Sequence, residues 1–147
     1  MAVHETEEVQ DSPSEWVANH IRSYVDSDGK EGQFWNGYPT LLLTVRGRKS
    51  GKLHRTALIY GRDGDNLLLV ASSGGAPKHP SWYLNLTDNP EVTVQVGADV
   101  FAARARTATP EEKPALWQNV VSVFPPYAEY QTKTDRQIPV VILEPVG

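Results

Sequence analysis

The segment "TLLLTVRGRKSGKLHRTALIYG" (residues 40–61) decides the fold, because it places two short apolar runs on either side of a basic loop. The runs, 40–45 and 55–61, are rich in β-prone residues, which predicts two strands. A third such run, 66–72, follows the sequence "RDGD", which is typical of a hairpin turn. We therefore expect three consecutive strands, with the basic loop joining the first two.

Helices and further strands are predicted on both sides of this segment. A helix beginning at Ser12 has Pro13 in its first turn and Glu15 closing a capping box, and it ends near residue 28. Its apolar face consists of Val17, Ile21, Tyr24 and Val25. The other predicted elements are a short helix 81–88, a hairpin of strands 91–96 and 100–107, a helix 109–124 whose capping box is Thr109 with Glu112, and a closing strand 138–145.

Six strands in antiparallel hairpins, with a few helices at their ends, predict a mainly β (α+β) fold, a small closed or split barrel. A parallel doubly wound sheet is excluded, because it requires a helix between nearly every pair of strands. The length of 147 residues is that of one domain. We expect a flexible acidic tail over residues 1–11 and a single domain over residues 12–147 that begins with a helix.

Composition narrows the classes of partner. The net charge of −4 argues against nucleic-acid binding and against a membrane-surface protein, because both favour a basic chain. Cysteine is absent, which excludes disulfides, thiolate metal sites and a cysteine nucleophile. The N-terminus lacks the pattern of a signal peptide, and the apolar runs are far shorter than the roughly 20 residues that span a bilayer. We expect a soluble, cytoplasmic protein.

The basic loop does not match a phosphate-binding P-loop. The sequence "GRKSGK" has three residues between its glycines instead of four, and Leu53 stands where a Ser or Thr would hold magnesium. The chain contains no G-x-S-x-G nucleophile elbow and no H-E-x-x-H zinc helix. Its four histidines are scattered without metal-ligand spacing. These patterns favour neither a hydrolase nor a metal enzyme.

Two loops have the composition of anion-binding sites. In the first, Arg48, Lys49 and Lys52 supply positive charge, and two glycines allow backbone N–H groups to point inward. The second, "SSGGAPKHPS" (residues 72–81), has two glycines, a lysine, hydroxyls and then a helix N-terminus. Each loop alone is more typical of a solvated turn. Their occurrence after neighbouring strands favours one shared site.

Aromatic residues are candidates for the same site. Trp82 and Tyr83 are typical of helix residues that pack on a sheet. Tyr127 and Tyr130 are three residues apart and share one helix face. A phenol donates a hydrogen bond or a proton at neutral pH, so this pair is either structural or catalytic.

Taken together, these segments resemble the deazaflavin-dependent nitroreductase family of mycobacteria and other actinomycetes. The resemblance runs from about Pro39 to Pro145 and is carried by the order and content of "LLLTVRGRKSGK", "VASSGGAPKHPSWYLNLTDNPEVTVQV" and "FPPYAEYQTKTDRQIPVVILEP". It implies a split β-barrel of the flavin-reductase and pyridoxamine-oxidase-like type. It also implies an oxidoreductase that uses coenzyme F420.

The resemblance further implies which residues bind F420, whose phosphate and polyglutamate tail are anionic. The basic loop would hold the phosphate region, and the strand that follows would lie along the ring system. The implied cofactor-binding residues are Arg48, Lys49, Ser50, His54, Arg55, Thr56, Ala57, Leu58, Ile59, Val70, Ala71, Ser72, Ser73, Ser81, Trp82, Tyr83, Leu84 and Asn85. Tyr127 and Tyr130 are the implied catalytic residues, which orient or protonate the substrate.

The chain departs from the family pattern at several of these positions. Ser73 stands where a phosphate-binding lysine is common, and Leu53 with His54 stands where the family commonly has proline and arginine. Ile59 and Phe124 stand where nitroreductase relatives have tyrosines. The first departures predict weaker binding of the cofactor tail, and the last two leave the class of acceptor open.

The predicted function is hydride transfer from reduced F420 to an electron-poor acceptor, either a quinone, an enone or unsaturated lactone, or a nitroaromatic. The acceptor is expected under the N-terminal helix and the loop containing Trp35, with Tyr127 donating a proton or hydrogen bond. Two alternatives remain open: a non-catalytic F420 carrier, and a barrel that binds FMN or haem. The expected partners are a small-molecule acceptor and, if the chain is not a monomer, a second copy in a homodimer. No nucleic acid and no stable membrane insertion are expected, although peripheral association at the membrane occurs in some relatives.

Overall fold

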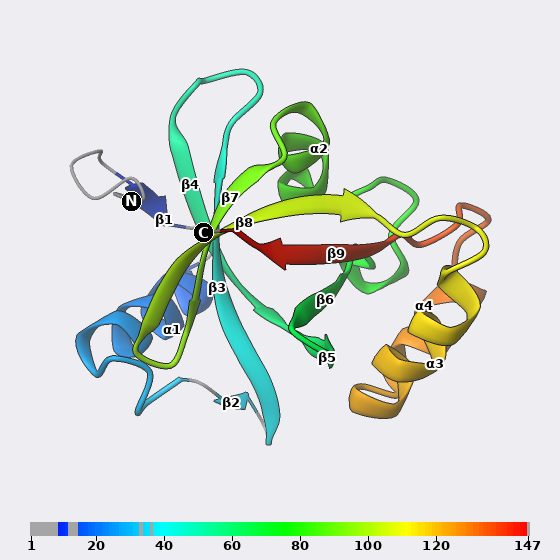
Figure 1. The fold of residues 1–147 in the computed structure, drawn as a ribbon, viewed down its shortest axis with the longest axis horizontal. Coiled ribbons are helices and arrows are strands. Elements are labelled where there is room, and N and C mark those ends of the chain that lie inside the picture. Colours follow the sequence, from blue (N-terminus) through cyan, green and yellow to red (C-terminus); the bar gives the residue numbers. More distant parts are fainter. Residues whose placement is uncertain (1–8, 12–14, 33, 36, 147) are drawn as a thin grey trace.

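The structure is a computed structural model that describes residues 9–11, 15–32, 34–35 and 37–146. The described strands belong to one connected sheet, and the helices lie around it (Figure 1). The strands are β1 (Val9–Asp11), β2 (Phe34–Trp35), β3 (Tyr38–Arg46), β4 (Leu53–Ile59), β5 (Gly61–Asp63), β6 (Asn66–Val70), β7 (Glu91–Val96), β8 (Asp99–Thr107) and β9 (Val140–Pro145). The helices are α1 (Glu15–Asp26), α2 (Ser81–Asp88), α3 (Lys113–Val123), α4 (Pro126–Thr132) and the short 3-10 helix η1 (Ser73–Gly75).

One continuous segment of the chain closes the sheet into a half-barrel. The strand order is β1-β4-β3-β7-β8-β9-β6-β5, with β2 paired to β3, so β4 and β5 lie near opposite ends of the order. Only Tyr60 separates these two strands in the chain, and its N–H donates to the Pro39 carbonyl (3.2 Å). Before Tyr60 the chain, as β4, pairs with β3. After Tyr60 the chain, as β5, pairs with β6, beginning with Gly61 opposite Leu68. The predicted mainly β split barrel is confirmed, but the strand expected over 55–61 is two strands.

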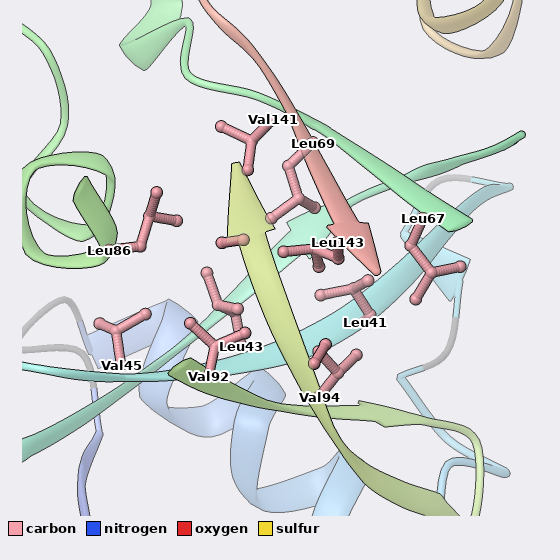
Figure 2. Packing of buried hydrophobic residues seen from close by; sticks show 12 residues of the cluster. Leu41, Leu43, Val45, Leu67, Leu69, Leu86, Val92, Val94, Val141 and Leu143 are labelled. Atoms are coloured by element: carbon pink, nitrogen blue, oxygen red, sulfur yellow. The ribbon is translucent and has the colours of Figure 1, made fainter. Parts of the chain in front are cut away.

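The interior of the barrel is filled by alternate side chains of its strands. Leu41 and Leu43 of β3 point into this cluster, whereas Leu42 points out toward α1. β6 and β9 also bury both faces, which explains why their apolar runs are continuous rather than alternating. Figure 2 shows that Leu86 of α2 joins the interior cluster from outside the sheet. The cluster consists of Leu41, Leu43, Val45, Leu67, Leu69, Leu86, Val92, Val94, Ala103, Ala105, Val141 and Leu143.

Helices α3 and α4 cover the outer face of β6 and β9 (Figure 1). A second apolar cluster joins Leu116 and Val120 of α3 to Phe124 and to Tyr127 of α4, on top of the outward side chains of both strands. The helix predicted over 109–124 is found as α3, which begins at Lys113, and the helix face expected for Tyr127 and Tyr130 is found as α4. α4 packs its aromatic residues over the end of β6, next to η1.

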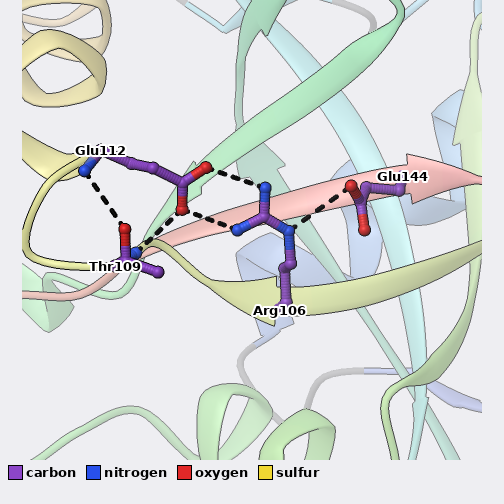
Figure 3. Close-up of polar contacts among 4 residues, drawn as sticks. All are labelled: Arg106, Thr109, Glu112 and Glu144. Carbon is purple, nitrogen blue, oxygen red and sulfur yellow. Dashed lines mark hydrogen bonds and ion pairs between the residues drawn. The ribbon is translucent and has the colours of Figure 1, made fainter.

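A capping box and an ion pair fix the start of α3 (Figure 3). The Thr109 hydroxyl accepts from the Glu112 N–H (3.2 Å), and the Glu112 carboxylate accepts from the Thr109 N–H (3.0 Å), as predicted. The same carboxylate accepts two bonds from the Arg106 guanidinium (2.7 and 2.9 Å), which also contacts Glu144 (3.4 Å). The bonds from Arg106, and then that from Thr109, lower the pKa of Glu112 to about 2. Pro114 lies in the first turn, where its missing N–H leaves no helical bond unmade.

Helix α1 is anchored to the sheet at its C-terminal end. The Tyr24 hydroxyl is buried, donates to the Thr40 carbonyl (3.1 Å) and accepts from the Gly97 N–H (2.7 Å). Gly29 follows the helix with φ +82°, and a Cβ there would lie 2.2 Å from the Gly97 Cα. Ile21 packs beside Tyr24, which confirms the predicted apolar face. The predicted cap residues 12–13 lie outside the described residues.

The acidic N-terminal segment differs from the prediction of a flexible tail over residues 1–11. Residues 9–11 form β1, which pairs in parallel with residues 53–55 of β4. The Asp11 carboxylate accepts a hydrogen bond from the Arg55 guanidinium (2.7 Å), so this segment is joined to β4 by a side-chain contact as well. Residues 1–8 lie outside the described residues. No helix in the described part of the chain is long and apolar enough to cross a bilayer.

The contact between Gly29 and Gly97 gives a first prediction about stability. Gly29→Ala places a side chain at positive φ and against backbone atoms that cannot move away easily. We expect a loss of about 3 kcal/mol or more in the free energy of unfolding, measured by urea denaturation. The matched control is Gly64→Ala, since Gly64 has φ +62° and a Cβ there would meet no other atom within 4 Å. It should lose only about 1–2 kcal/mol. Equal losses would show that the contact with Gly97 does not constrain α1.

Candidate functional site

Two cavities adjoin each other along β4. The first, called the basic cavity here, has a volume of about 600 Å³ and is lined by Asp11, Val45, Gly47, Arg48, Lys49, Ser50, His54, Arg55, Thr56, Ser81, Trp82 and Asn85. The second, called the aromatic cavity, has a volume of about 480 Å³ and is lined by Val17, His20, Thr40, Thr56, Ala57, Leu58, Ile59, Val70, Ser72, Ser73, Pro80, Trp82, Phe124, Tyr127 and Tyr130. Both share Thr56 and Trp82, so one extended ligand can occupy the two. Their sizes are typical of small-molecule and cofactor sites.

The basic loop between β3 and β4 is fixed by its own hydrogen bonds. The Gly47 N–H donates to the Lys52 carbonyl (2.8 Å), and the Gly51 N–H donates to the Gly47 carbonyl (3.0 Å). The Ser50 hydroxyl bonds to His54 (3.0 Å), and a Cβ at Gly47 would lie 2.7 Å from that hydroxyl oxygen. A side chain at Gly47 would therefore displace the bonded pair of Ser50 and His54.

The backbone of this loop does not offer the row of inward N–H groups expected from its glycines. Four of its amides already donate within the protein. Those of Gly47 and Gly51 donate to backbone carbonyls, that of Arg48 donates to the Asn85 side chain, and that of Lys52 donates to the Ser50 hydroxyl. Within the described part of the chain, no acceptor is found for the amides of residues 49 and 50. An anion is thus offered two backbone donors together with charged side chains.

Arg48 is held in place without losing its charge. Its N–H (3.1 Å) and its guanidinium (2.7 Å) both donate to the Asn85 side-chain oxygen, which ties the loop to α2. Asn85 is buried and neutral, so the arginine keeps its net charge. Around the basic cavity the only carboxylate among the described residues is Asp11, which pairs with Arg55. Arg48 and Lys49 therefore leave the cavity positively charged.

The middle of β4 presents an open edge to the aromatic cavity. On one side β4 pairs with β3 along residues 53–59, but on the other β1 pairs only with residues 53–55. From Thr56 to Ile59 no described strand covers that second edge, and all four residues line the cavity. Such an edge has unpaired N–H and C=O groups in a row. It can bind the polar rim of a planar ring through backbone hydrogen bonds.

The second predicted loop is held by one arginine. The guanidinium of Arg136 donates to the carbonyls of Ala71 (3.1 Å), Ser72 (2.7 Å) and Ala76 (2.8 Å), and to Nδ1 of His79 (3.1 Å). Since arginine only donates, Nδ1 must accept. Sequence analysis did not single out this residue, because nothing in the local pattern shows that it returns to residues 71–79.

A close approach between backbones brings this loop to α4. A Cβ at Gly75 would lie 2.7 Å from the Tyr130 carbonyl oxygen and 3.0 Å from the Lys133 Cβ, and Gly75 has φ +83°. Glycine at this position lets η1 pack directly on α4. As a result Ser73, at φ +47°, lies in the wall of the same cavity as Tyr130.

Tyr127 and Tyr130 both line the aromatic cavity, from one face of α4 as predicted. Tyr127 is buried, with its ring edge-on to Phe124 (4.9 Å between centroids). Burial, and then the neighbouring Tyr130, raise the pKa of the Tyr127 phenol. Its hydroxyl takes part in no hydrogen bond with the described residues. Among the described residues nothing uses this protonated phenol as a donor, so it is a candidate to bind a ligand.

All predicted site residues line one of the two cavities except Ala71, Tyr83 and Leu84. Ala71 is buried and only its backbone takes part, and Tyr83 packs on the interior cluster with its hydroxyl bonded to Thr107 (2.9 Å). On α2 the cavity-facing positions are Ser81, Trp82 and Asn85, so the two residues between them face elsewhere. The lining residues that sequence analysis missed are Asp11, Val17, His20, Thr40, Val45, Pro80 and Phe124.

The side chain of Trp35, expected over the substrate, lies outside the part of the chain that the structure describes. Among the described residues there is no group of three or more His, Cys, Asp or Glu side chains that could hold a metal ion. The functional groups that line the two cavities are cations, the Asp11 carboxylate, hydroxyls, phenols, the Asn85 amide, one imidazole in each cavity and backbone amides.

Arg136 gives the second prediction. Arg136→Lys keeps the charge but cannot reach three carbonyls and a ring nitrogen at once. We expect a loss of about 2–4 kcal/mol in the free energy of unfolding, because buried carbonyls are left without donors. Arg104→Lys on β8 is the matched control, since that arginine is exposed. It should change stability by no more than about 0.5 kcal/mol. A similar small change for Arg136→Lys would contradict the role given to this guanidinium.

The third prediction concerns pH. Burial, and then the positive charge of Arg136, lower the pKa of His79 below 6.5. Between the lowered pKa and 6.5 the unfolded chain binds the proton more readily, so stability falls as the pH decreases through this window. His79→Asn keeps an acceptor for Arg136 but does not titrate. Its free energy of unfolding should therefore decrease less than that of the wild type between about pH 7 and pH 5. If the free energy of unfolding decreased equally in the two proteins, protonation of His79 beside Arg136 would not be the cause of the decrease.

Comparison with known proteins places the chain in a family. The family model described as F420H(2)-dependent quinone reductase matches residues 16–145. An F420H(2)-dependent quinone reductase of Mycobacterium tuberculosis is 38% identical over 143 residues, covering 88% of this chain and 96% of the relative.

Solved structures agree with this match. A structure of an F420H2-dependent reductase has a TM-score of 0.67 and 48% identity, covering 72% of this chain and 94% of its own. Another, described as a domain-swapped dimer, has a TM-score of 0.71 and 42% identity, covering 90% of this chain and 100% of its own. A Listeria innocua structure of the pyridoxamine 5'-phosphate oxidase type, at TM-score 0.51 and 16% identity, shares the fold alone. The chain therefore belongs to the F420H(2)-dependent quinone reductase family, and it is an oxidoreductase whose cofactor is coenzyme F420.

Proposed function

We propose that this chain reduces quinones with F420H2, and that the cofactor lies along β4 across both cavities. The observation that carries the proposal is the open edge of β4 at residues 56–59, which runs from a positively charged cavity into an aromatic one. A ligand that matches this path has a planar ring with polar edges at one end and anionic groups at the other. F420 has both, and a quinone acceptor agrees with the names of the relatives.

The residues present fit this cofactor. The two free amides at residues 49 and 50, with Arg48 and Lys49 beside them, suit the phosphate and the start of the acidic tail. The backbone of β4 suits the ring, and Ser81 and Trp82 at the start of α2 form the opposite wall. The cofactor supplies a hydride when it is bound. The chain itself supplies binding, orientation and the handling of protons.

The departure at Ser73 bears on this fit. Ser73 is exposed in the wall of the aromatic cavity, and Lys78, the lysine of the same loop, lines neither cavity. Binding of the anionic part therefore depends on the loop between β3 and β4 rather than being shared between two loops. This makes the contribution of Lys49 larger than it would be in a site with a second lysine.

The acceptor would occupy the part of the aromatic cavity near α4 and α1. Phe124 and Val17 give this region apolar walls suited to a quinone ring, and Tyr127 offers a hydrogen-bond donor for a carbonyl oxygen. Since burial raises the pKa of Tyr127, its phenol remains protonated at neutral pH and can donate to that oxygen throughout the reaction. Tyr130, less buried, would border the entrance.

The proposal is tested by binding and turnover measured on the same preparation. Fluorescence titration gives the affinity for F420, and oxidation of F420H2 is followed with a simple quinone, an enone and a nitroaromatic as acceptors. Preferred reduction of the quinone is the expected result. Tight stoichiometric F420 binding with no turnover of any acceptor would support a carrier instead, and preferred reduction of the enone or the nitroaromatic would change the acceptor class.

The fourth prediction tests the position of the cofactor tail. Lys49→Ala should raise the Kd and KM for F420H2 by about three- to tenfold and leave kcat unchanged, because the lost contact binds ground state and transition state alike. Lys52→Ala is the matched control: it removes the same charge from the same loop, but Lys52 is exposed and outside both cavities. Its Kd should change less than about twofold. A collapse of kcat in Lys49→Ala with KM unchanged would contradict the proposed path of the tail.

A further inference from the structure

Reduction of a quinone to a hydroquinone requires a proton as well as a hydride, and the aromatic cavity offers few sources for it. Among the described residues that line it, the titratable side chains are His20, Tyr127 and Tyr130. The two phenols come from α4, and the imidazole comes from α1. No charged side chain of β4, β6, η1 or α2 belongs to the lining. Arg55 of β4 comes directly before Thr56, the first β4 residue that lines the aromatic cavity. Arg55 lines the basic cavity instead and pairs with Asp11.

His20 is held in one orientation by a backbone carbonyl. Its Nε2 lies 2.6 Å from the Gly32 carbonyl oxygen, and because a carbonyl only accepts, Nε2 must carry a hydrogen. The exchangeable position of the ring is therefore Nδ1. A Cβ at Gly32 would lie 3.4 Å from Nε2 and 3.3 Å from the Tyr24 Cβ, so the chain passes close over the helix at this point.

The helix that carries His20 is itself fixed. Ile21 and Tyr24 follow His20 by one and four residues and are both buried in the same cluster. The Tyr24 hydroxyl bonds to three backbone groups of β3 and the β7–β8 hairpin. An imidazole with one nitrogen bonded to a carbonyl, on an anchored helix, in the wall of a cavity has the arrangement of a general acid.

We infer that His20 donates the proton to the oxygen of the reduced quinone, with Tyr127 stabilising the developing charge by a hydrogen bond. The inference rests on the proposed function. The quinone gains a hydride from the reduced cofactor and one proton from Nδ1 of His20, which forms an O–H bond. Besides the hydride, the reduced cofactor would release one proton to water and so become the oxidised form. Water would then return a proton to His20, which completes the cycle. Tyr127 suits the stabilising role rather than the acid role, because burial disfavours its phenolate.

The principal test compares His20→Gln with the wild type in kcat, pH profile and F420 binding. Glutamine can keep the N–H bond to the Gly32 carbonyl but cannot donate a proton. We expect kcat with a quinone to decrease by about 100-fold or more. The pH profile of kcat should also differ between the variant and the wild type, because the proton then has to come from another source. The Kd for F420 should stay within about twofold of the wild-type value, because His20 belongs to α1, on the side of the aromatic cavity proposed for the acceptor and not for the cofactor.

His54→Gln provides the matched control, since His54 is an imidazole of the basic cavity on the cofactor side. It should weaken F420 binding and keep the wild-type pH dependence of kcat. The same change of the pH profile in both variants would overturn the assignment to His20.

A second measurement needs neither turnover nor a substituted protein. Side-chain nitrogen NMR of the wild type with bound F420 should show His20 with a proton on Nε2, and addition of a hydroquinone should shift the Nδ1 signal of His20 but not that of His79. An unshifted His20, or a His20→Gln variant with wild-type kcat and pH profile, would overturn the inference while leaving quinone reduction intact. A wild-type protein that reduces no quinone would overturn the proposed function, and the inference with it.

Discussion

The continuity of the chain from β4 to β5 is the constraint on which the site depends. Because the same segment pairs first with β3 and then with β6, the sheet has to curve around its apolar interior and close. This places β4 near the end of the strand order, where only three residues of β1 cover its outer edge. The uncovered residues 56–59 are the ones that line the aromatic cavity. The bend at Tyr60 between β4 and β5 therefore both closes the barrel and leaves one edge of β4 uncovered.

The two loops beside that edge are held in a way that preserves positive charge. Arg48 bonds to a neutral amide and Arg136 to carbonyls and an imidazole, so no carboxylate of the described residues neutralises either arginine. Arg55, by contrast, is paired with Asp11. The first loop therefore combines a rigid shape with an uncompensated charge, which is what an anionic ligand requires. The guanidinium of Arg136 instead bonds to protein groups of residues 71–79 and holds that loop. Its positive charge also disfavours protonation of His79.

Sequence patterns predicted the parts of the molecule that depend on neighbours in the chain. The apolar runs of β3, β6 and β9 and the capping box of Thr109 with Glu112 are of this kind. The break at Tyr60 was not predicted, because both halves of the run are equally apolar and only the pairing partner changes. β1 was missed because its short polar sequence forms a strand only through contact with β4. The same distinction applies to the site. Tyr83 and Leu84 were predicted as site residues because the family resemblance implied the whole segment 81–85. A helix turns only part of its surface toward any one cavity, so these two residues do not line it. His20 was missed for a related reason, since its place in the cavity wall follows from how α1 is anchored and not from a motif.

The division of the aromatic cavity between separate elements suggests how specificity for the acceptor arises. β4 and η1 are fixed to the barrel by ladder hydrogen bonds and by Arg136, so the side of the cavity proposed for the cofactor is rigid. The side proposed for the acceptor is formed by α1 and α4, which are anchored elsewhere, α1 through Tyr24 and Gly29 at its far end. A change in these remote anchors would move Val17 and His20 relative to Tyr127 without touching the cofactor groove. In the proposed arrangement, the packing of the outer helices therefore sets the shape of the acceptor side while the groove proposed for the cofactor stays unchanged.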